Sequence, residues 1–345
     1  MSDLSPVSPV QARALVASLD ARESASPITG AGVLALDLTA PGADADPDGW
    51  HALAARLMAL PCPVLSLSPA GIDPAYGALE VASDVHAASE DELRRLVGRV
   101  RSFPLASLAL VQLLRQTPFL DVVPGLTAES WVYSMLQTGP EFGRWLEAQR
   151  AAGGAGREVE EGPPVALHRR DARLELVLDR PSRHNAYSAT MRDALVEGLA
   201  VALADPSIEE VVLRGEGASF CSGGDLDEFG TAPDPVTAHA VRSTRHPAHA
   251  LSQLSGRLRA ELKGACIGAG MELPAWAGRV VADESAFFEL PELGMGLVPG
   301  AGGTVSLPRR IGRERTGWLA LSGERIDVAT ARRWGLVDEV RTVRD

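Results

Sequence analysis

The second half of this 345-residue chain alternates short apolar runs with helical spacing, and this alternation limits the folds open to it. Strands and helices alternating at this pitch predict an α/β domain with mostly parallel pairing. The predicted strands are 165–168, 174–178, 210–213, 258–263 and 279–282, and the predicted helices are 188–203, 236–254, 313–321 and 328–334. In such a domain, ligands bind beyond the carboxyl ends of the strands, where turns expose backbone N–H groups.

The first half is organised differently, and a linker separates it from the second. Residues 151–164 run from small residues through charges to two prolines, which is typical of a linker. We expect an N-terminal tail at 1–29, an accessory region at 30–150 and a catalytic domain at 165–345. Within the accessory region, the predicted strands are 33–38 and 64–67, and the predicted helices are 49–60, 90–101, 105–115 and 127–150.

Two glycine-rich turns each follow a predicted strand. The first is Ser222-Gly223-Gly224-Asp225, and the second is Gly268-Ala269-Gly270. Glycine lets the backbone approach a ligand closely, and two N–H groups converging on one carbonyl oxygen would form an oxyanion hole, where losing one donor costs roughly 3 kcal/mol. The alternative for a lone glycine pair is a tight turn, and no G-x-G-x-x-G opens a helix in the first βα unit.

Two glutamates follow the second turn in apolar surroundings. Glu272 lies two residues beyond Gly270, and Glu292 lies in the sequence Leu-Pro-Glu-Leu-Gly. Taken singly, each is better interpreted as a helix-start or surface residue. Held close together, two carboxylates raise one pKa, which provides an acid and a base at neutral pH. Pro274 puts the local placement of Glu272 in question, because a proline deeper in a helix kinks it.

Composition limits the class of partner. The chain has 33 basic and 45 acidic residues, a formal net charge of −12, which disfavours binding to nucleic acid. It lacks an apolar run of about 18 residues, so no membrane span is expected. The N-terminus has no signal-peptide pattern, so we expect a cytoplasmic protein.

The cysteines and histidines do not predict a disulfide framework or a metal site. The cysteines form no disulfide framework and no paired metal motif (Cys62, Cys221, Cys266). The densest histidine cluster favours a solvated face over a metal site (His239, His246, His249). The absence of a G-x-S-x-G elbow argues against a serine esterase.

The chain from 174 to 340 resembles the crotonase, or enoyl-CoA hydratase/isomerase, superfamily. The resemblance rests on motifs that follow one another at ordinary spacing: 179–186 (DRPSRHNA), 219–226 (SFCSGGDL), 263–273, 291–304, 322–324 (SGE) and 334–338 (WGLVD). It implies a crotonase-like ββα-superhelix in the C-terminal half and an acyl-CoA thioester as the substrate. It implies that no metal or redox cofactor is needed and that coenzyme A is present only as part of the substrate. It also implies a homo-oligomer, either a trimer or a hexamer.

The resemblance also assigns roles to single residues. The two oxyanion-hole amides fall on Gly224 and Ala269, where many relatives have glycine at the second position. Glu272 and Glu292 match the two glutamates of the hydratases, with Glu292 as the α-proton donor and Glu272 as the water-activating base. The CoA end would lie against Arg183, His184, Ser222, Gly223, Asp225 and Leu226, with Arg183 as a phosphate donor.

Several functions stay open at this point. Retention of both glutamates favours an enoyl-CoA hydratase. The alternatives are a double-bond isomerase or an acyl-CoA hydrolase of the same superfamily, and a non-catalytic acyl-CoA-binding subunit.

The family's later helices have counterparts in the first half. Relatives continue beyond the strand near 336–340 with several helices, whereas this sequence ends at Asp345. Residues 103–115 resemble the first of those helices and residues 129–136 the next. We therefore hypothesise that 30–150 is a degenerate crotonase-like copy whose helices pack on the catalytic domain. The alternative is an unrelated helical extension.

Overall fold

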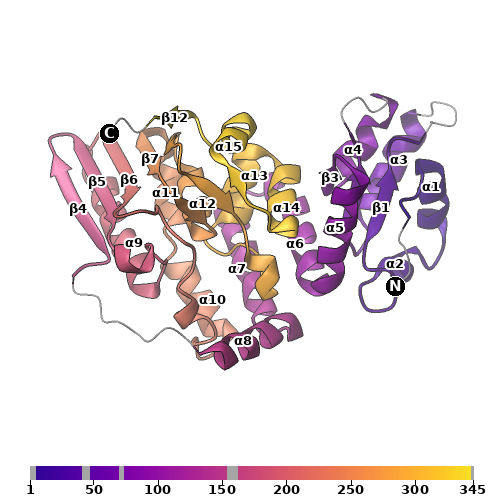
Figure 1. Cartoon of the computed structure of the whole chain (residues 1–345), viewed down its shortest axis with the longest axis horizontal. Coiled ribbons are helices and arrows are strands. Elements are labelled where there is room, and N and C mark those ends of the chain that lie inside the picture. Colours follow the sequence, from indigo (N-terminus) through magenta and orange to yellow (C-terminus); the bar gives the residue numbers. More distant parts are fainter. Residues whose placement is uncertain (1–4, 41–46, 70–73, 154–161, 343–345) are drawn as a thin grey trace. The chain divides into compact units, whose positions relative to one another are not determined.

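The computed structural model describes residues 5–40, 47–69, 74–153 and 162–342, which form two compact units (Figure 1). The first unit comprises Met1–Gln116 and Arg313–Ser322, and the second comprises Thr117–Gly312 and Gly323–Asp345. This division differs from the predicted one, which placed the boundary at 151–164. Residues 154–161 of that predicted linker lie outside the described residues.

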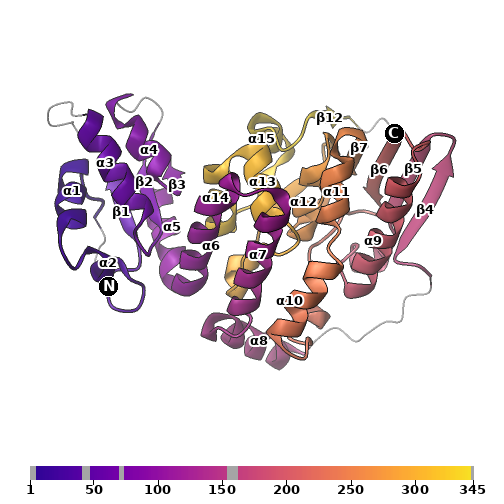
Figure 2. The ribbon, with the colours of Figure 1, turned by 180° about the vertical axis from the view of Figure 1, so that it is seen from behind.

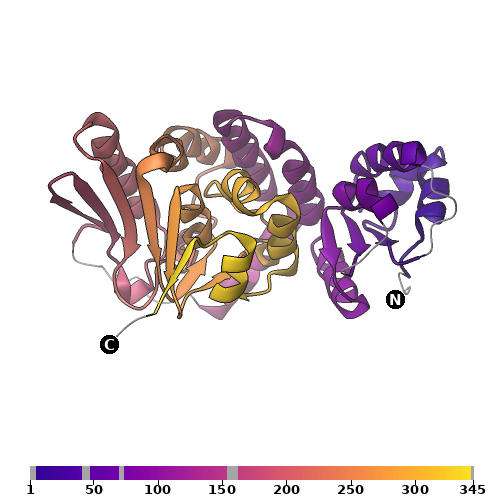
Figure 3. The same cartoon turned by 90° about the horizontal axis from the view of Figure 1, so that it is seen from above.

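The second unit is built on a six-stranded sheet in the order β12-β9-β7-β6-β5-β4 (Figure 3). The five strands from β5 to β12 pair in parallel, and β4 pairs antiparallel with β5 at the edge. A smaller sheet has the order β11-β10-β8. The strands are β4 (Val165–Arg170), β5 (Arg173–Leu178), β6 (Glu210–Gly215), β7 (Leu258–Leu262), β8 (Ala265–Ile267), β9 (Arg279–Asp283), β10 (Phe287–Glu289), β11 (Ile326–Asp327) and β12 (Glu339–Arg341).

Successive turns of the chain stack on one another in this unit. Strand β7 pairs with β9 in the large sheet, and the strands that follow them, β8 and β10, pair with each other in the small sheet. The preceding segment of the chain adds a third layer in the same way. Its strand β6 pairs with β7 in the large sheet, and Cys221, which follows β6, pairs in parallel with Cys266 of β8. This repeating strand–strand–helix arrangement is the predicted ββα-superhelix, with the mostly parallel pairing expected from the sequence.

Helices cover the sheets and bring functional residues to their edges. Figure 2 shows α7 beside α10, two helices that pack on each other, with α8 at their end. The helices of this unit are α7 (Val122–Leu136), α8 (Pro140–Ala152), α9 (Ala189–Ala204), α10 (Pro235–Thr244), α11 (Ala248–Leu254), α12 (Ala269–Glu272), α13 (Gly303–Ile311) and α15 (Val328–Trp334). Helix α9 packs on β4 and β5, and α13 packs on α7 and α12.

Two predicted helices are each divided in two by a proline. The helix expected at 127–150 ends at Leu136 and restarts at Pro140, and the helix expected at 236–254 ends at Thr244 and restarts after Pro247. Proline has no N–H to donate and clashes with the preceding turn, so a helix cannot continue through it without a kink. The helix at Gly303–Ile311 was not predicted, since glycines and Pro308 mask its pattern.

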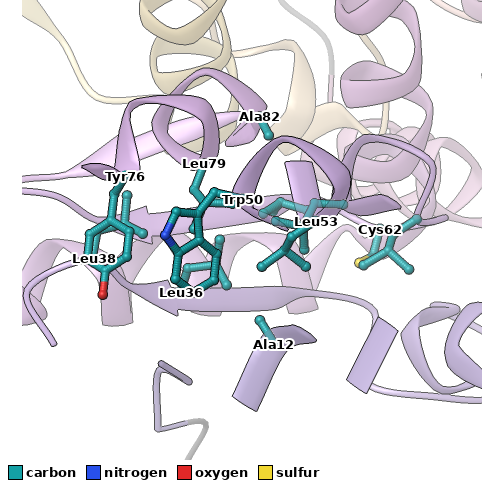
Figure 4. Close-up of a cluster of buried hydrophobic side chains, with 12 residues drawn as sticks. Ala12, Leu36, Leu38, Trp50, Leu53, Cys62, Tyr76, Leu79 and Ala82 are labelled. Atoms are coloured by element: carbon teal, nitrogen blue, oxygen red, sulfur yellow. The ribbon is translucent and has the colours of Figure 1, made fainter. Parts of the chain in front are cut away.

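The first unit has its own parallel sheet, in the order β1-β2-β3, and its own core. In Figure 4, Leu36, Trp50 and Tyr76 lie together in this core, where the two aromatic rings meet edge to face at 5.6 Å. The elements are β1 (Leu34–Asp37), β2 (Val64–Leu67), β3 (Val85–Ala87), α1 (Pro9–Ala17), α2 (Ala21–Ala25), α3 (Pro47–Met58), α4 (Gly77–Ala82), α5 (Glu90–Ser102), α6 (Pro104–Gln116) and α14 (Arg313–Ser322). Short 3₁₀ turns join elements in both units.

The predicted tail at 1–29 packs into this unit over its described part. Val7 forms a parallel bridge with Leu36, and Ala12 of α1 is fully buried in the core. A buried ion pair at 2.5 Å between Arg115 and Asp84 links α6 to the sheet. Among the described residues, no single helix is long and apolar enough to cross a membrane; Glu90–Ser102 and Pro104–Phe119 meet that criterion only together and are bent by 108°.

Candidate active site

Strand pairing brings the two glycine turns side by side. The Cys221 N–H donates to the Ala265 carbonyl at 3.0 Å, and the Ile267 N–H donates to the Cys221 carbonyl at 3.0 Å. The segment that enters the first turn therefore runs parallel to β8, which enters the second. The turns are 45 residues apart in sequence, from 224 to 269, yet they emerge at the same edge of the fold.

The amides of Gly224 and Ala269 are free to bind a ligand oxygen. Both residues line the same cavity, and within the described ranges neither N–H donates to a protein acceptor. Ala269 is the first residue of α12, where a helix leaves its N–H groups without intrahelical partners. Ala269 is buried and its methyl group is accommodated, so the alanine does not block the site. The arrangement supplies two donors to a carbonyl oxygen.

The two glutamates reach this cavity from different segments. Glu272 ends α12, and Glu292 begins a 3₁₀ turn after β10. Pro274 starts the next 3₁₀ turn, so it does not kink the helix that carries Glu272. A side chain at position 268 would place its Cβ 2.4 Å from Oε1 of Glu292, so Gly268, which has φ of +51°, is needed for that carboxylate to sit beside the second turn.

The carboxylates differ in their hydrogen bonds. Oε2 of Glu272 accepts from the N–H groups of Ala301 at 2.7 Å and Gly303 at 2.8 Å. Oε2 of Glu292 is buried and has no hydrogen-bond partner in the part of the chain that the structure describes. Glu272 is thus held rigidly, whereas Glu292 keeps an oxygen available to a ligand.

Burial and repulsion by other carboxylates raise the pKa of both groups, which makes them weaker acids than usual. Burial raises the pKa of Glu272 well above its ordinary value, and the charges of Glu292 and Glu129 raise it further. Burial likewise raises the pKa of Glu292, to about 8. Raised pKa values keep a carboxyl group protonated at neutral pH, and with the other carboxyl ionised the pair could serve as one acid and one base.

A third carboxylate, Glu129, holds the loop that binds Glu272. It comes from α7 and accepts from the Gly302 N–H at 2.8 Å, the Thr304 N–H at 2.9 Å and the Thr304 hydroxyl at 2.6 Å. Glu272 accepts from the alternate amides of the same loop. The two carboxylates therefore fix the loop together, and burial raises the pKa of Glu129 to about 7. The sequence motifs gave Glu129 no role, although the likeness of 129–136 to a family helix was a signal.

Helix α8 supports the first turn and the Glu292 segment. Its Trp145 packs edge to face on Phe229 at 5.5 Å and stacks on Phe142 at 5.7 Å. A Cβ at position 224 would lie 2.7 Å from the Phe229 ring, so this aromatic cluster borders the oxyanion turn directly. The chain around Phe142 also packs closely on Gly296, just after the turn that carries Glu292.

A cavity of about 890 Å³ joins these parts. Six of the predicted site residues line it: Gly224, Ala269, Glu272, Glu292, Arg183 and Asp225. The other four, His184, Ser222, Gly223 and Leu226, are not among its described lining residues and lie in or beside the turns that shape it. The lining also includes Tyr133 and Arg242, which the sequence did not indicate.

The predicted phosphate donor is already engaged. Arg183 pairs with Asp225 at 3.1 Å and with Asp227 at 2.6 Å, and Arg180 pairs with Asp225 at 3.0 Å. Burial alone would raise the pKa of Asp225, but the hydrogen bond from Arg180 and the charges of the two arginines outweigh it and hold this pKa below its usual value. A phosphate would have to share Arg183 with these carboxylates.

The histidine cluster differs from the solvated face that the sequence predicted. His246 is buried, and burial lowers its pKa to about 3, while His239 contacts Ser130 at 2.9 Å. Among the described residues, no group of three or more His, Cys, Asp or Glu side chains is placed to hold a metal ion. Burial raises the pKa of the Cys221 thiol to about 12, so this thiol is a poor nucleophile.

Comparison with known proteins matches the second half of the chain to one family. The family model for enoyl-CoA hydratase/isomerase matches residues 170–345. The 2,3-dehydroadipyl-CoA hydratase of Escherichia coli is 37% identical over 177 residues, which are 51% of this chain and 68% of that protein. The 1,2-epoxyphenylacetyl-CoA isomerase of Escherichia coli is 33% identical over 171 residues, 48% of this chain and 65% of that protein.

Among solved structures, an enoyl-CoA hydratase subunit from Geobacillus kaustophilus is similar, with 29% identity and a TM-score of 0.48. That match covers 52% of this chain and 70% of that one.

The family model and the curated relatives define an enzyme of the crotonase type. The chain belongs to the enoyl-CoA hydratase/isomerase family, so the resemblance and the fold class predicted from the motifs are confirmed. The matched segment spans about two thirds of the curated relatives' length. It begins after α7 and α8, the helices that supply Glu129 and Trp145 to the site.

Proposed function

We propose that this protein is an enoyl-CoA hydratase, which adds water across the 2,3 double bond of an enoyl-CoA thioester. One observation carries the proposal: two buried carboxylates with raised pKa values, Glu272 and Glu292, line the same cavity as two backbone amides that have no acceptor among the described residues. Relatives in the family include both hydratases and isomerases, and retention of both glutamates favours hydration.

The amides of Gly224 and Ala269 would hold the thioester carbonyl. When water attacks the β carbon, negative charge develops on the thioester oxygen, and the two N–H groups stabilise the enolate that forms. Each such donor typically contributes roughly 3 kcal/mol of barrier lowering. The donors are fixed by parallel pairing of Cys221 with Cys266, so little reorganisation is needed during the reaction.

The hydrogen bonds of the glutamates suit the roles predicted for them. The two backbone N–H groups that donate to Oε2 of Glu272 stabilise its ionised form, in which it would take the proton from water. Glu292, whose Oε2 has no partner in the described residues, keeps an oxygen free to carry a proton and would deliver it to the α carbon. Atoms balance, because the water supplies the hydroxyl group and replaces the proton that is consumed.

A crotonyl-CoA absorbance assay tests the proposal. The wild-type chain should remove the conjugated enoyl absorbance, and Glu292→Gln should abolish that activity. Glu209→Gln, at an exposed glutamate outside the cavity, is the matched control and should retain activity. Conversion of a 3-enoyl-CoA without hydration would indicate an isomerase, release of free CoA thiol a hydrolase, and ligand binding without turnover a binding subunit. Each of these results would overturn the hydratase assignment.

Three further properties belong to this proposal. Hydration by two carboxylates requires no metal or redox cofactor, with coenzyme A entering only as part of the substrate. The protein would act in the cytoplasm, as an oligomer built from three or six copies. Light scattering coupled to size-exclusion chromatography tests the oligomer, and a monomer of 36.3 kDa would contradict it.

A further inference from the structure

Most arginines that line the cavity have a carboxylate partner. These cations therefore bring little free positive charge to a ligand, because each is neutralised nearby. The pairs are Arg180–Asp225 at 3.0 Å, Arg183–Asp227 at 2.6 Å, Arg192–Asp193 at 2.9 Å and Arg245–Glu197 at 2.9 Å.

Arg242 differs, because it forms no ion pair with any described carboxylate. Its guanidinium donates to the Ser130 hydroxyl at 3.1 Å and to the Ser134 hydroxyl, and it lies 4.8 Å from the centre of the Tyr133 ring. All these partners are uncharged. Arg242 is half-buried, and burial lowers its pKa from the usual value. Glu129 attracts the guanidinium electrostatically but forms no ion pair with it in the part of the chain that the structure describes. A desolvated cation without an ion-pair partner is costly, and an anion that binds beside it recovers that cost.

Arg242 lies close to the proposed reaction centre. Tyr133 lines the cavity with it, and the same tyrosine interacts electrostatically with Glu272 and Glu292 as well as with Arg242. A Cβ at position 300 would lie 2.4 Å from the Tyr133 ring, so this ring also packs against the start of the loop that holds Glu272. Tyr133 therefore lies near both Arg242 and the proposed catalytic carboxylates.

We propose that Arg242 binds a carboxylate at the far end of the acyl group, so that the preferred substrate is an enoyl-CoA with a terminal carboxylate. The inference rests on the proposed function and deepens it. An anionic acyl group would otherwise be repelled by those of Glu129, Glu272 and Glu292 that are ionised, and the guanidinium supplies the compensating charge. A planar guanidinium binds a carboxylate with paired hydrogen bonds.

Equilibrium binding of two saturated thioesters tests this without turnover. Adipyl-CoA and hexanoyl-CoA have six carbons each and differ in whether the acyl chain ends in a carboxylate or a methyl group. We expect the wild-type protein to bind adipyl-CoA at least about tenfold more tightly, a difference of about 1.4 kcal/mol. Arg242→Met should remove this preference, and Arg242→Lys should keep part of it.

The controls separate this role from others that Arg242 could play. Arg245→Met removes a cation that is already paired with Asp193 and Glu197, and it should leave the preference largely intact. Because the measurement is a ratio of two affinities for one preparation, partial loss of folding does not alter it. Both thioesters share the CoA portion, so a contact to its phosphates would change the two affinities equally.

Several results would overturn the inference. They are equal affinity of the wild-type protein for the two thioesters, an unchanged ratio in Arg242→Met, and weakening of both ligands by the same factor. A shift in the pH profile of Arg242→Met without a change in ligand preference would also overturn it, because Arg242 would then only tune the glutamates. Loss of hydration with the binding preference intact would refute the hydratase assignment alone.

Discussion

Replacing Glu129 with glutamine should impair the site although Glu129 is outside the segment that matches the family. The carboxylate accepts three hydrogen bonds from Gly302 and Thr304. An amide group has one acceptor oxygen, so its NH₂ must face at least one of these donors. The less costly orientation leaves the buried Gly302 N–H unsatisfied, at about 1–3 kcal/mol of stability.

The loss should reach catalysis through the loop that Glu272 shares. Ala301 and Gly303 alternate with Gly302 and Thr304 along the chain, so a shift of one pair moves the other. Misplacement by about 1 Å can cost roughly a hundredfold in rate. We expect kcat/KM for crotonyl-CoA to fall by at least about tenfold, which corresponds to about 1.4 kcal/mol.

The pH profile provides a second measurement, which a purely structural role would not move. The charge of Glu129 raises the pKa of both Glu272 and Glu292. Removing that charge should move the high-pH limb of kcat/KM, which reports loss of the acid's proton, to lower pH. The low-pH limb should move less, because Glu129, with a pKa of about 7, is itself largely protonated there.

Two variants complete the test. Thr304→Val removes one hydrogen bond but keeps the charge, so it should lower the rate without moving the high-pH limb. Glu147→Gln, at an exposed position of α8, should behave as the wild type. Unchanged kcat/KM and an unchanged profile in Glu129→Gln would refute the role assigned to Glu129.

Three further predictions concern stability and the extent of the catalytic unit. Burial lowers the pKa of His246 to about 3, so below pH 6.5 the unfolded state binds a proton that the folded state does not. The unfolding free energy should therefore drop by up to about 1.4 kcal/mol for each pH unit below 6.5. Urea titrations should show a flatter pH dependence for His246→Asn. Equal slopes would contradict this. Arg115→Met removes the hydrogen bonds from Arg115 to Asp84 and to buried backbone carbonyls, while Arg313 still pairs with Asp84. We expect it to cost about 1–3 kcal/mol, detected as faster amide exchange in the first unit, and unchanged exchange would count against it. A fragment of residues 157–345 should hydrate crotonyl-CoA at least about a hundredfold more slowly than the whole chain, because it lacks Glu129; full activity in the fragment would show that the preceding helices are dispensable.

The fold and the four proposed catalytic positions could be predicted because their signals are local. Alternation of strands and helices is visible within short windows, and parallel pairing follows from it. The glycine turns stand directly after strands, and Glu272 follows the second turn by two residues. Their convergence at one edge of the sheet requires no knowledge of distant contacts.

The remaining features depend on contacts between distant segments. Glu129 is separated from Gly302 by 173 residues, and the spacing of charges gives no indication that they meet. That Arg242 has no carboxylate partner among the described residues is likewise visible only in three dimensions. The helix boundaries at Pro140 and Pro247 were missed for another reason, since apolar spacing continued on both sides of each proline.

The hypothesis of a degenerate second copy at 30–150 stays a prediction. The structure adds that these residues are divided between the two compact units. Helices α7 and α8 group with the catalytic unit, while α6 groups with the first unit and its three-stranded sheet. The region therefore does not behave as one block. Residues that hold the catalytic loops, Glu129 and Trp145, precede the family match, and residues 313–322 within that match belong to the first unit. We therefore expect a working site to require residues from 117 onward, a boundary that the family motifs alone do not indicate.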